Sequence, residues 1–473
     1  MTSIGTSTSD LPIPTKSKEY EGTDLALLHN LDLFQKIPIS NQIKSEIYVP
    51  IQPVNLLDSN SGRSGGSLQF RIFGDDFFLD LHNSYFIFNV KIIKQQDGSA
   101  VSWPSAKVGP VNGFGHSLIR NLTIRLDNVS ISPNYQTYAF SQYLQALLNF
   151  DSASRATKLQ TLGWSLDIEK QMDKLITSNL SDPTAFSCEN SGLLKRRSFF
   201  HSDGSIQLYV PLNIDLASQP KYLLNKLNVD INLHLNSSAF ALMHADGAAD
   251  EKYDFQLTKA ELYLCKIELQ DATRLALETV LSKYDAIYEY NEKIVRLLTL
   301  TQGQRHFSFD PLFSGIKPLR LHLALGTSSA VQGKSSLNPY NFQHFGIESI
   351  RVYQNAKSFP YHDQRFNFET GEFMQPFMDL HRAAGCDLSN NNNISLTRSQ
   401  YATGGFCIFS YEFQPSAIQD SDVRGMYDKG PFRIDLRFKQ ALTENLTAIL
   451  YLEFPAKIRI TKSRNVITSQ SQS

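Results

Sequence analysis

The fold is indicated most clearly by the stretch Leu227-Asn-Val-Asp-Ile-Asn-Leu-His-Leu235, in which every odd position is apolar and every even position is polar. Strict alternation of this kind predicts a β-strand with one face buried and the other in water. Phe432-Arg-Ile-Asp-Leu-Arg-Phe438 repeats the pattern and places Arg433, Asp435 and Arg437 on its outer face. Both stretches favour antiparallel sheets that cover a core on one side.

Strands are predicted along most of the chain, separated by turn residues such as Asp97-Gly98, Asp203-Gly204 and the Asn-rich stretch 390–393. A content of 31 Phe and 20 Tyr suits such pleated, half-buried surfaces. The further predicted strands are 45–51, 68–73, 85–93, 118–126, 206–210, 255–269, 319–325, 406–413 and 446–454.

Three segments have the spacing of amphipathic helices, namely 135–150, 271–283 and 372–384. The region 151–195 is mixed and helix-leaning, and we interpret it as an insertion. The order strands, helix, strands occurs twice, because helix 135–150 follows the strand around Leu122 and helix 372–384 follows the strand around Ile350. Each half also ends on an alternating strand followed by a long apolar one, 227–235 with 255–269 and 432–438 with 446–460.

This repeated order predicts an all-β chain of two tandem eight-stranded jelly-roll β-sandwiches with a few short helices. The N-terminal arm is either frayed or ordered against a neighbouring subunit, and the polar tail is expected to be mobile. The predicted division is an N-terminal arm at 1–44, a first jelly roll at 45–270 that contains the insertion 151–195, a linker helix at 271–283, a second jelly roll at 284–462 and a C-terminal tail at 463–473.

Charge and cysteine content narrow the function classes. A formal net charge of −1 over 473 residues argues against a protein that binds nucleic acid over its whole surface. The four cysteines are widely spaced, which is untypical of zinc sites and disulfide frameworks, and Cys265 and Cys407 lie in apolar runs that predict core positions. The N-terminus has no apolar signal core and no run approaches the ~20 residues of a membrane span. We therefore expect synthesis in a reducing compartment.

No catalytic, cofactor-binding or metal-binding residue can be assigned from the sequence, and we expect no enzyme. Gly62-Arg63-Ser64-Gly65-Gly66 lacks the lysine and the helix of a phosphate-binding loop and is interpreted as a loop joining two strands. His306 beside Arg305 has no recognisable partner.

Two polar clusters are candidate sites. Asp75, Asp76, Asp80 and His82 could ligate a metal, but a solvated edge or a hydrogen-bond network between subunits is favoured. Lys195-Arg196-Arg197 could contact nucleic acid or an acidic partner, but a solvated strand entry is favoured.

Three stretches carry a family resemblance, namely Ser45-Glu-Ile-Tyr-Val-Pro-Ile-Gln-Pro53, Leu68-Gln-Phe-Arg-Ile72 and Asp80-Leu-His-Asn-Ser-Tyr-Phe86. They resemble the major capsid (hexon-like) proteins of Maverick/Polinton transposons and adintoviruses, within the wider double jelly-roll lineage of adenoviruses and virophages. The resemblance is strongest over about 45–130 and continues to the last strand near 460.

The resemblance implies a homotrimer that forms a pseudo-hexagonal tile of an icosahedral shell around double-stranded DNA. It implies neighbouring capsomers, penton and minor capsid proteins as partners, a location in the virion, cytoplasmic synthesis and assembly in the cytoplasm or nucleus. Neither sequence-specific nucleic-acid recognition nor a membrane span is expected. We expect the trimer contact to use apolar loop residues (Phe307, Phe309, Phe313, Tyr340 and Phe342), with the connections 151–195 and 237–254 at the tile's top or between subunits.

Three other functions are compatible with parts of the sequence. A tandem β-sandwich lectin or receptor ectodomain would predict a secretory route and disulfides. A hydrolase on a jelly-roll scaffold would need paired carboxylates in a cleft, for which Asp75, Asp76 and Asp80 are the only local group. A penton or minor capsid protein would more typically be a single, shorter jelly roll.

Overall fold

In the computed structural model, most strands of the unit formed by residues 43–473 lie in four antiparallel sheets. Most of the expected N-terminal arm and the Asn-rich stretch lie outside the described residues. The structure describes residues 40–55, 57, 61–132, 136–178, 186–246, 251–355, 357–359, 364–386, 394–413 and 429–469.

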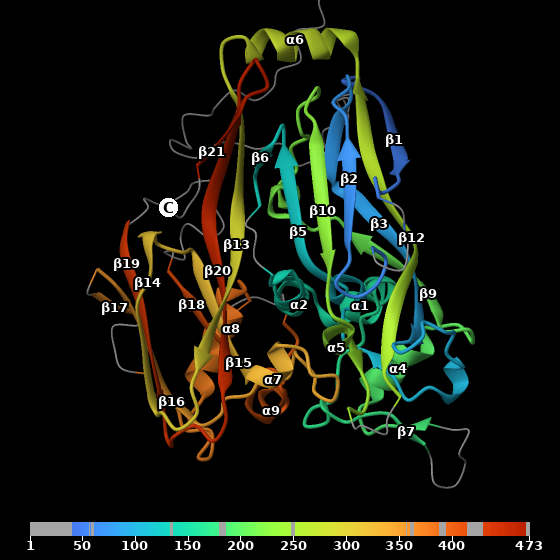
Figure 1. Cartoon of the computed structure of the whole chain (residues 1–473). Helices are drawn as coiled ribbons and strands as arrows, with labels where there is room; N and C mark the ends of the chain where they lie inside the picture. The colour runs from blue at the N-terminus through green and yellow to red at the C-terminus, as the bar shows by residue number, and fades with distance from the viewer. Residues whose placement is uncertain are drawn as a thin grey trace, which may run out of the picture. The chain divides into compact units, whose positions relative to one another are not determined.

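Two four-stranded antiparallel sheets make the first sandwich (Figure 1). Their strand orders are β1-β12-β3-β9 and β2-β10-β5-β6. The bounds are β1 (Ile43–Ile51), β2 (Ser67–Ile72), β3 (Phe78–Lys94), β5 (Ile119–Leu126), β6 (Val129–Ser130), β9 (Ser205–Pro211), β10 (Val229–Leu235) and β12 (Tyr253–Leu269).

Two further antiparallel sheets make the second sandwich, with the orders β13-β20-β15-β18 and β14-β19-β16-β17. A short strand, β21 (Val466–Ser469), pairs with β20. The other bounds are β13 (Ala286–Leu300), β14 (His306–Ile316), β15 (Arg320–Thr327), β16 (Ile347–Gln354), β17 (Lys357–Phe359), β18 (Ile408–Glu412), β19 (Lys429–Phe438) and β20 (Leu446–Ile460).

The two sandwiches have the same topology. If the eight main strands of each are counted in chain order, both sandwiches pair them as 1-8-3-6 in one sheet and 2-7-4-5 in the other. This is the jelly-roll wiring, so the predicted fold class is confirmed. The alternating strands and the long apolar strands that suggested a repeat are the seventh and eighth strands of both halves.

Helices lie in the connections rather than in the sheets (Figure 1). The helices predicted at 135–150, 271–283 and 372–384 are confirmed as α2 (Tyr138–Asn149), α6 (Asp271–Leu281) and α8 (Met374–Ala383). Among the described residues no helix is long and apolar enough to cross a membrane. The remaining short elements are α1 (Phe114–Ser117), α3 (Ser152–Ala156), α4 (Ser191–Ser198), α5 (Ser238–Ala241), α7 (Ser328–Val331), α9 (Arg398–Thr403), η2 (Trp103–Ser105), η3 (Lys158–Leu162), η4 (Asp215–Ser218), β4 (Gly109–Pro110), β7 (Thr177–Ser178), β8 (Phe186–Ser187) and β11 (Leu242–Met243).

The core of each sandwich lies between its two sheets. In the first, Val229, Ile231 and Leu233 on β10 are fully buried, as the alternation predicted. Phe86 and Phe88 on β3 are also fully buried in the same cluster. At about 25 cal/mol per Å² of apolar surface removed from water, these inward faces supply the main driving force for folding.

The eighth strand of the second sandwich departs from the one-sided pattern. Every residue of β20 from Leu446 to Ala456 is buried, on both faces of the sheet. The alternation within 446–454 therefore describes only one of two buried faces. Alternation in the sequence shows which face is more apolar, but a second layer can cover the other face as well.

Two regions differ from the sequence expectation. β13 and β14 were not among the predicted strands, although β13 pairs with β20 along its whole length. Part of the tail that was expected to be mobile is strand β21, and Arg464 just before it donates to Glu278 of α6 at 2.6 Å.

Candidate functional site

α2 lies in the region where the two sandwiches meet, which we call the joint. The ring of Tyr143 on α2 stacks on Tyr340 of the second half, with centroids 4.0 Å apart and an interplanar angle of 2°. Phe140 meets Tyr340 edge-on at 5.8 Å, and Trp164 packs on Tyr143 at 5.3 Å. Most residues of α2 are buried. Its apolar side chains belong to a hydrophobic cluster that includes strands of the second sandwich.

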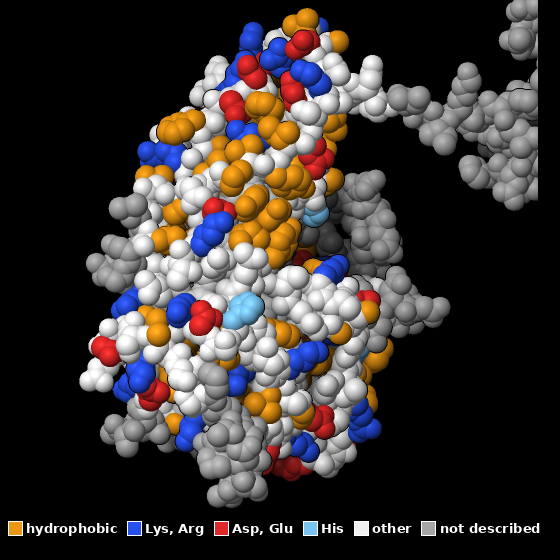
Figure 2. All heavy atoms as spheres, turned by 90° about the vertical axis from the view of Figure 1, so that its right-hand side faces the viewer, with side chains coloured by type: hydrophobic (Ala, Val, Ile, Leu, Met, Phe, Trp, Pro, Cys, Tyr) orange, Lys and Arg blue, Asp and Glu red, His pale blue; other side chains and the backbone are white. Residues whose placement is uncertain are grey.

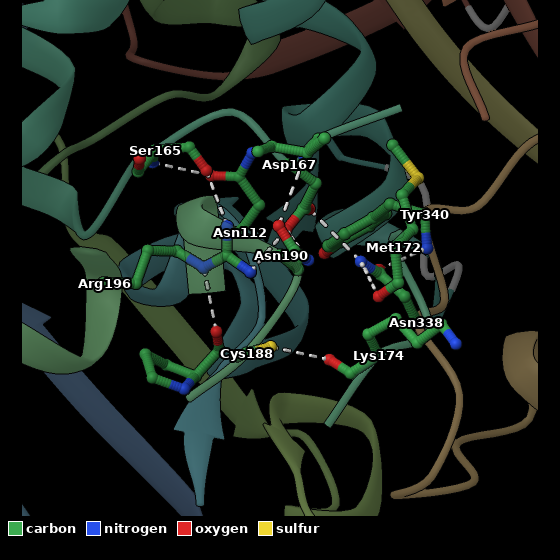
Figure 3. A network of polar contacts seen from close by, with 12 residues as sticks. Asn112, Ser165, Asp167, Met172, Lys174, Cys188, Asn190, Arg196, Asn338 and Tyr340 are labelled. Atoms are coloured by element: carbon green, nitrogen blue, oxygen red, sulfur yellow. Dashed lines mark hydrogen bonds and ion pairs between the residues drawn. The ribbon is translucent and has the colours of Figure 1, made fainter. Parts of the chain in front are cut away.

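A buried ion pair lies at the centre of a polar network in the joint (Figure 3). Arg196 Nη2 is 2.8 Å from Asp167 Oδ1, and both side chains are completely buried. The other guanidinium nitrogens donate to the carbonyl oxygens of Pro110 at 2.9 Å and Ser165 at 2.6 Å. Asn190 Nδ2 donates to the same Asp167 oxygen at 2.8 Å. A buried charge pair needs such additional hydrogen bonds to offset its desolvation.

The same carboxylate reaches the second half of the chain. Asn338 Nδ2 donates to Asp167 Oδ2 at 3.2 Å, and the backbone N–H of Asn338 donates to Asp173 at 2.7 Å. Burial raises the pKa of Asp173, although the bonds from Asn338 and Asn341 oppose that rise. The network thus joins residues 165–196 of the first half to 338–341 of the second.

Local sequence explains how Arg196 reaches this position. α4 carries it, and the helix begins at Ser191 with Gly192 against the backbone of residues 166–167. A Cβ atom on Gly192 would lie 2.3 Å from the carbonyl oxygen of Leu166, so this close approach requires glycine.

A second polar group in the joint surrounds a small cavity of about 60 Å³. Its lining includes Tyr138, Gln142, Asp215 and Lys293. Asp215 accepts a bond from the backbone N–H of Lys293 at 3.0 Å. Burial raises the pKa of Asp215 to about 7, opposed by Lys293 and reinforced by Glu292 and Glu453.

A larger hollow of about 230 Å³ lies on the second sandwich. His344, which stacks on Phe368 at 4.1 Å, lines it, and burial lowers the pKa of this histidine. Two of the carboxylates that line it are engaged with cations, because Glu369 pairs with Lys439 and Glu348 lies 3.2 Å from Arg437. We find no nucleophile with an adjacent base in this hollow.

The acidic cluster considered in the sequence is not brought together as one site. Asp75 pairs with Lys266 at 2.5 Å, Asp76 lies 3.6 Å from Lys226, and Asp80 accepts a bond from Asn83 at 2.8 Å. The ring of His82 contacts the carbonyl oxygen of Ala217 instead. Within the described residues no group of three His, Cys, Asp or Glu side chains could hold a metal ion.

The interpretation of Lys195-Arg196-Arg197 as a solvated strand entry was wrong. The run lies in helix α4, where Arg196 is fully buried and Arg197 packs over the ring of Trp103 at 4.9 Å. The sequence offers no local signal for this burial, because Asp167 lies 29 residues away.

The aromatic residues expected to contact other subunits are used within the chain. Tyr340 and Phe342 are fully buried in the cluster around the joint, so they cannot supply a contact between copies. Phe307, Phe309 and Phe313 belong to strand β14 rather than to a loop. Cys265 and Cys407 are buried core residues, as predicted. His306 is exposed, and Gly62–Gly66 lies between β1 and β2.

The outer face of the sheet β1-β12-β3-β9 carries a ladder of four tyrosines, which we call the tyrosine face. Tyr85 on β3 stacks on Tyr209 at 4.2 Å and on Tyr263 at 5.2 Å, and Tyr48 on β1 lies 6.0 Å from it. Tyr48 is 45% exposed and Tyr209 39%. Figure 2 looks onto this side of the molecule and shows hydrophobic side chains gathered at its middle.

No protein-family model matches the chain. A Caenorhabditis elegans protein named "Uncharacterized protein F54H12.2" is 24% identical over 398 residues, which cover 82% of this chain and 90% of that protein.

Solved structures of viral proteins share the fold. The mavirus major capsid protein matches with a TM-score of 0.53 and 11% identity, over 99% of this chain and 97% of that one. A chain of the Sputnik virophage matches with a TM-score of 0.60 and 12% identity, over 95% and 94%. The Faustovirus major capsid protein matches with a TM-score of 0.54 and 9% identity, over 93% and 94%. At these identities the likeness shows the fold.

Proposed function

We propose that this protein is the major capsid protein of a double-stranded DNA virus or virus-like transposon. Three copies would form a pseudo-hexagonal tile of an icosahedral shell, next to penton and minor capsid proteins. The observation that carries the proposal is the repeated 1-8-3-6 and 2-7-4-5 strand order, together with near full-length fold similarity to the mavirus and Faustovirus major capsid proteins.

The joint supports this proposal physically. A tile built from two sandwiches per chain must hold them at one angle, because an error in that angle would stop a ring of copies from closing. Buried polar networks are suited to fixing one arrangement, since each hydrogen bond is satisfied in only one register. Arg196, Asp167 and Asn338 form such a network between the two halves.

The absence of a recognised reaction site in the described residues is consistent with a structural role but does not carry the proposal. The assignment to the Maverick/Polinton and adintovirus lineage rests on the stretches 45–53, 68–72 and 80–86. A location in the virion, with synthesis in the cytoplasm, follows from the same proposal.

The proposal is tested by the mass of the purified chain in solution and by its outline in negative stain. Light scattering should give a species of about three times 53.4 kDa. Class averages should show a hexagonal outline. A monomer at every concentration, with no assembly when the partner capsid proteins are co-expressed, would contradict the proposed function.

A further inference from the structure

The two sandwiches differ in what covers their equivalent sheets. By strand order, β13 and β20 correspond to β1 and β12. The middle of the outer face of β13 and β20 is covered by the first sandwich, whereas Ile287 and Leu297 near the two ends of β13 stay 40% and 41% exposed. Lys293 on β13 bonds Asp215 of η4 and Gln145 of α2, and Tyr451 on β20 is 1% exposed. No described segment covers the tyrosine face in the same way, since Tyr48 and Tyr209 stay exposed.

The connection equivalent to α2 presents an apolar surface. α8 also follows the fifth strand of its sandwich, and it packs on its own sandwich through Leu380 and Ala383. Met374 and Met378 lie one turn apart on the other side and are 39% and 42% exposed. Two exposed methionines on one helical stripe suit an aromatic partner, because the thioether packs well at ring edges.

We propose that the tyrosine face binds α8 of a second copy of this chain. The inference rests on the proposed trimer and names its contact. Within one chain, a helix of the first sandwich (α2) contacts the first strand of the second sandwich (β13). If the same relation repeats between copies, α8 of one copy contacts β1 of the next. Such a contact joins two different surfaces, and it closes into a ring when the rotation between copies fits.

Charge and hydrogen bonding at the tyrosine face are compatible with burial. The buried Glu261 is already bonded to Gln52 at 2.6 Å and to the Tyr263 hydroxyl at 3.1 Å, so covering it leaves no orphaned acceptor. At the rim, the exposed Glu46 neighbours Tyr48 on β1. Arg382 at the end of α8 pairs with Asp379 at 3.0 Å, and its side chain is still 57% exposed. Opposite charges at a rim favour the correct register between partners.

The test places a carboxylate on each side of the contact. Tyr209→Asp and Met378→Asp, measured by analytical ultracentrifugation of the full chain, should each raise the concentration at which trimers dissociate by about 30-fold or more. Tyr48→Asp gives a second variant on the tyrosine face, and Met374→Asp gives a second variant on α8. Leu275→Asp on α6, where the leucine is 71% exposed, is the matched control and should leave the mass unchanged. Thermal unfolding checks that each variant folds.

A mixture gives a readout that simple destabilisation would not. Tyr209→Asp keeps an intact α8 and Met378→Asp keeps an intact tyrosine face, so an equimolar mixture should form a dimer of one copy of each. Trimers that persist in all four variants, or that Leu275→Asp weakens equally, overturn the contact but leave the capsid role standing. A wild-type chain that stays monomeric and also fails to assemble with co-expressed partner capsid proteins overturns the proposed function as well.

Discussion

The interior of each sandwich and the joint between the sandwiches are built from different chemistry. The interiors are apolar faces of opposed sheets, such as Phe88 against the strands of the facing sheet. The joint combines stacked rings with a buried charge pair, as Tyr143, Arg196 and Asp167 show. Apolar packing tolerates small shifts, whereas a charge pair with every bond satisfied does not. We infer that the interiors of the sandwiches provide most of the stability of the fold. The joint fixes the orientation of one sandwich relative to the other.

The two tryptophans allow these regions to be followed separately. Trp103 belongs to the core cluster of the first sandwich, and Trp164 packs on Tyr143 in the joint. The variants Trp103→Phe and Trp164→Phe therefore leave one fluorescent reporter in each region. Comparisons must hold protein concentration fixed, because assembly stabilises the folded chain by mass action.

The largest effect is expected from Arg196→Met, which leaves Asp167 buried without its counter-charge. The free energy of unfolding should fall by about 3–5 kcal/mol. Urea unfolding followed by Trp164 fluorescence measures the loss. The double variant Arg196→Met with Asp167→Leu should regain much of it, because no uncompensated charge then stays buried. A loss below about 1 kcal/mol in the single variant would show that the pair does not hold the joint.

Truncation in the sandwich interiors should cost slightly less and should cost the same in both halves. Leu233 and Leu436 lie on the seventh strands of the two sandwiches and are both fully buried. Leu233→Ala and Leu436→Ala should each lower the free energy of unfolding by about 2–5 kcal/mol. The measurement is urea unfolding with Trp103 and Trp164 read in turn. If one of these variants left the free energy of unfolding unchanged, the two cores would not be equivalent in stability.

Asp215 should make the joint sensitive to pH. Its folded-state pKa of about 7 lies above the usual 3.8, so the protonated acid stabilises the fold below about pH 4 and that contribution is lost as the pH rises towards 7. The loss should be on the order of 2–4 kcal/mol. Asp215→Asn keeps an acceptor for the Lys293 N–H and should flatten the dependence. Unfolding free energies measured from pH 4 to 8 in both proteins test this; an equal decline in the variant would refute it.

The smallest effect is expected at Tyr143. Its ring packs in the joint, and its hydroxyl has no hydrogen-bond partner among the residues that the structure describes. Tyr143→Phe keeps the stacking on Tyr340 and removes a buried polar group. The free energy of unfolding should be unchanged or rise by about 1 kcal/mol. Tyr340→Phe is the matched control, because the Tyr340 hydroxyl lies 2.6 Å from Ser117 Oγ and its loss should destabilise. If Tyr143→Phe and Tyr340→Phe changed the free energy of unfolding equally, the two hydroxyls would not differ in hydrogen bonding as the structure shows.

The sequence predicted the elements that depend on neighbours along the chain. Alternation at 227–235 and 432–438 identified β10 and β19, and the spacing of apolar residues identified α2, α6 and α8. These patterns are local because a strand repeats every two residues and a helix every 3.6. β13 was missed because its polar residues interrupt the alternation, although its pairing with β20 fixes it in place.

The joint and the tyrosine face were decided only by the tertiary structure. The joint unites Arg196, Asp167 and Asn338, and the tyrosine face unites Tyr48, Tyr85 and Tyr209. No local period links positions so far apart, and a run such as Lys195–Arg197 has the same sequence whether it is solvated or buried. By itself the sequence determined which faces are apolar. Which of those faces another layer covers, and which is left open, depended on how the two sandwiches pack.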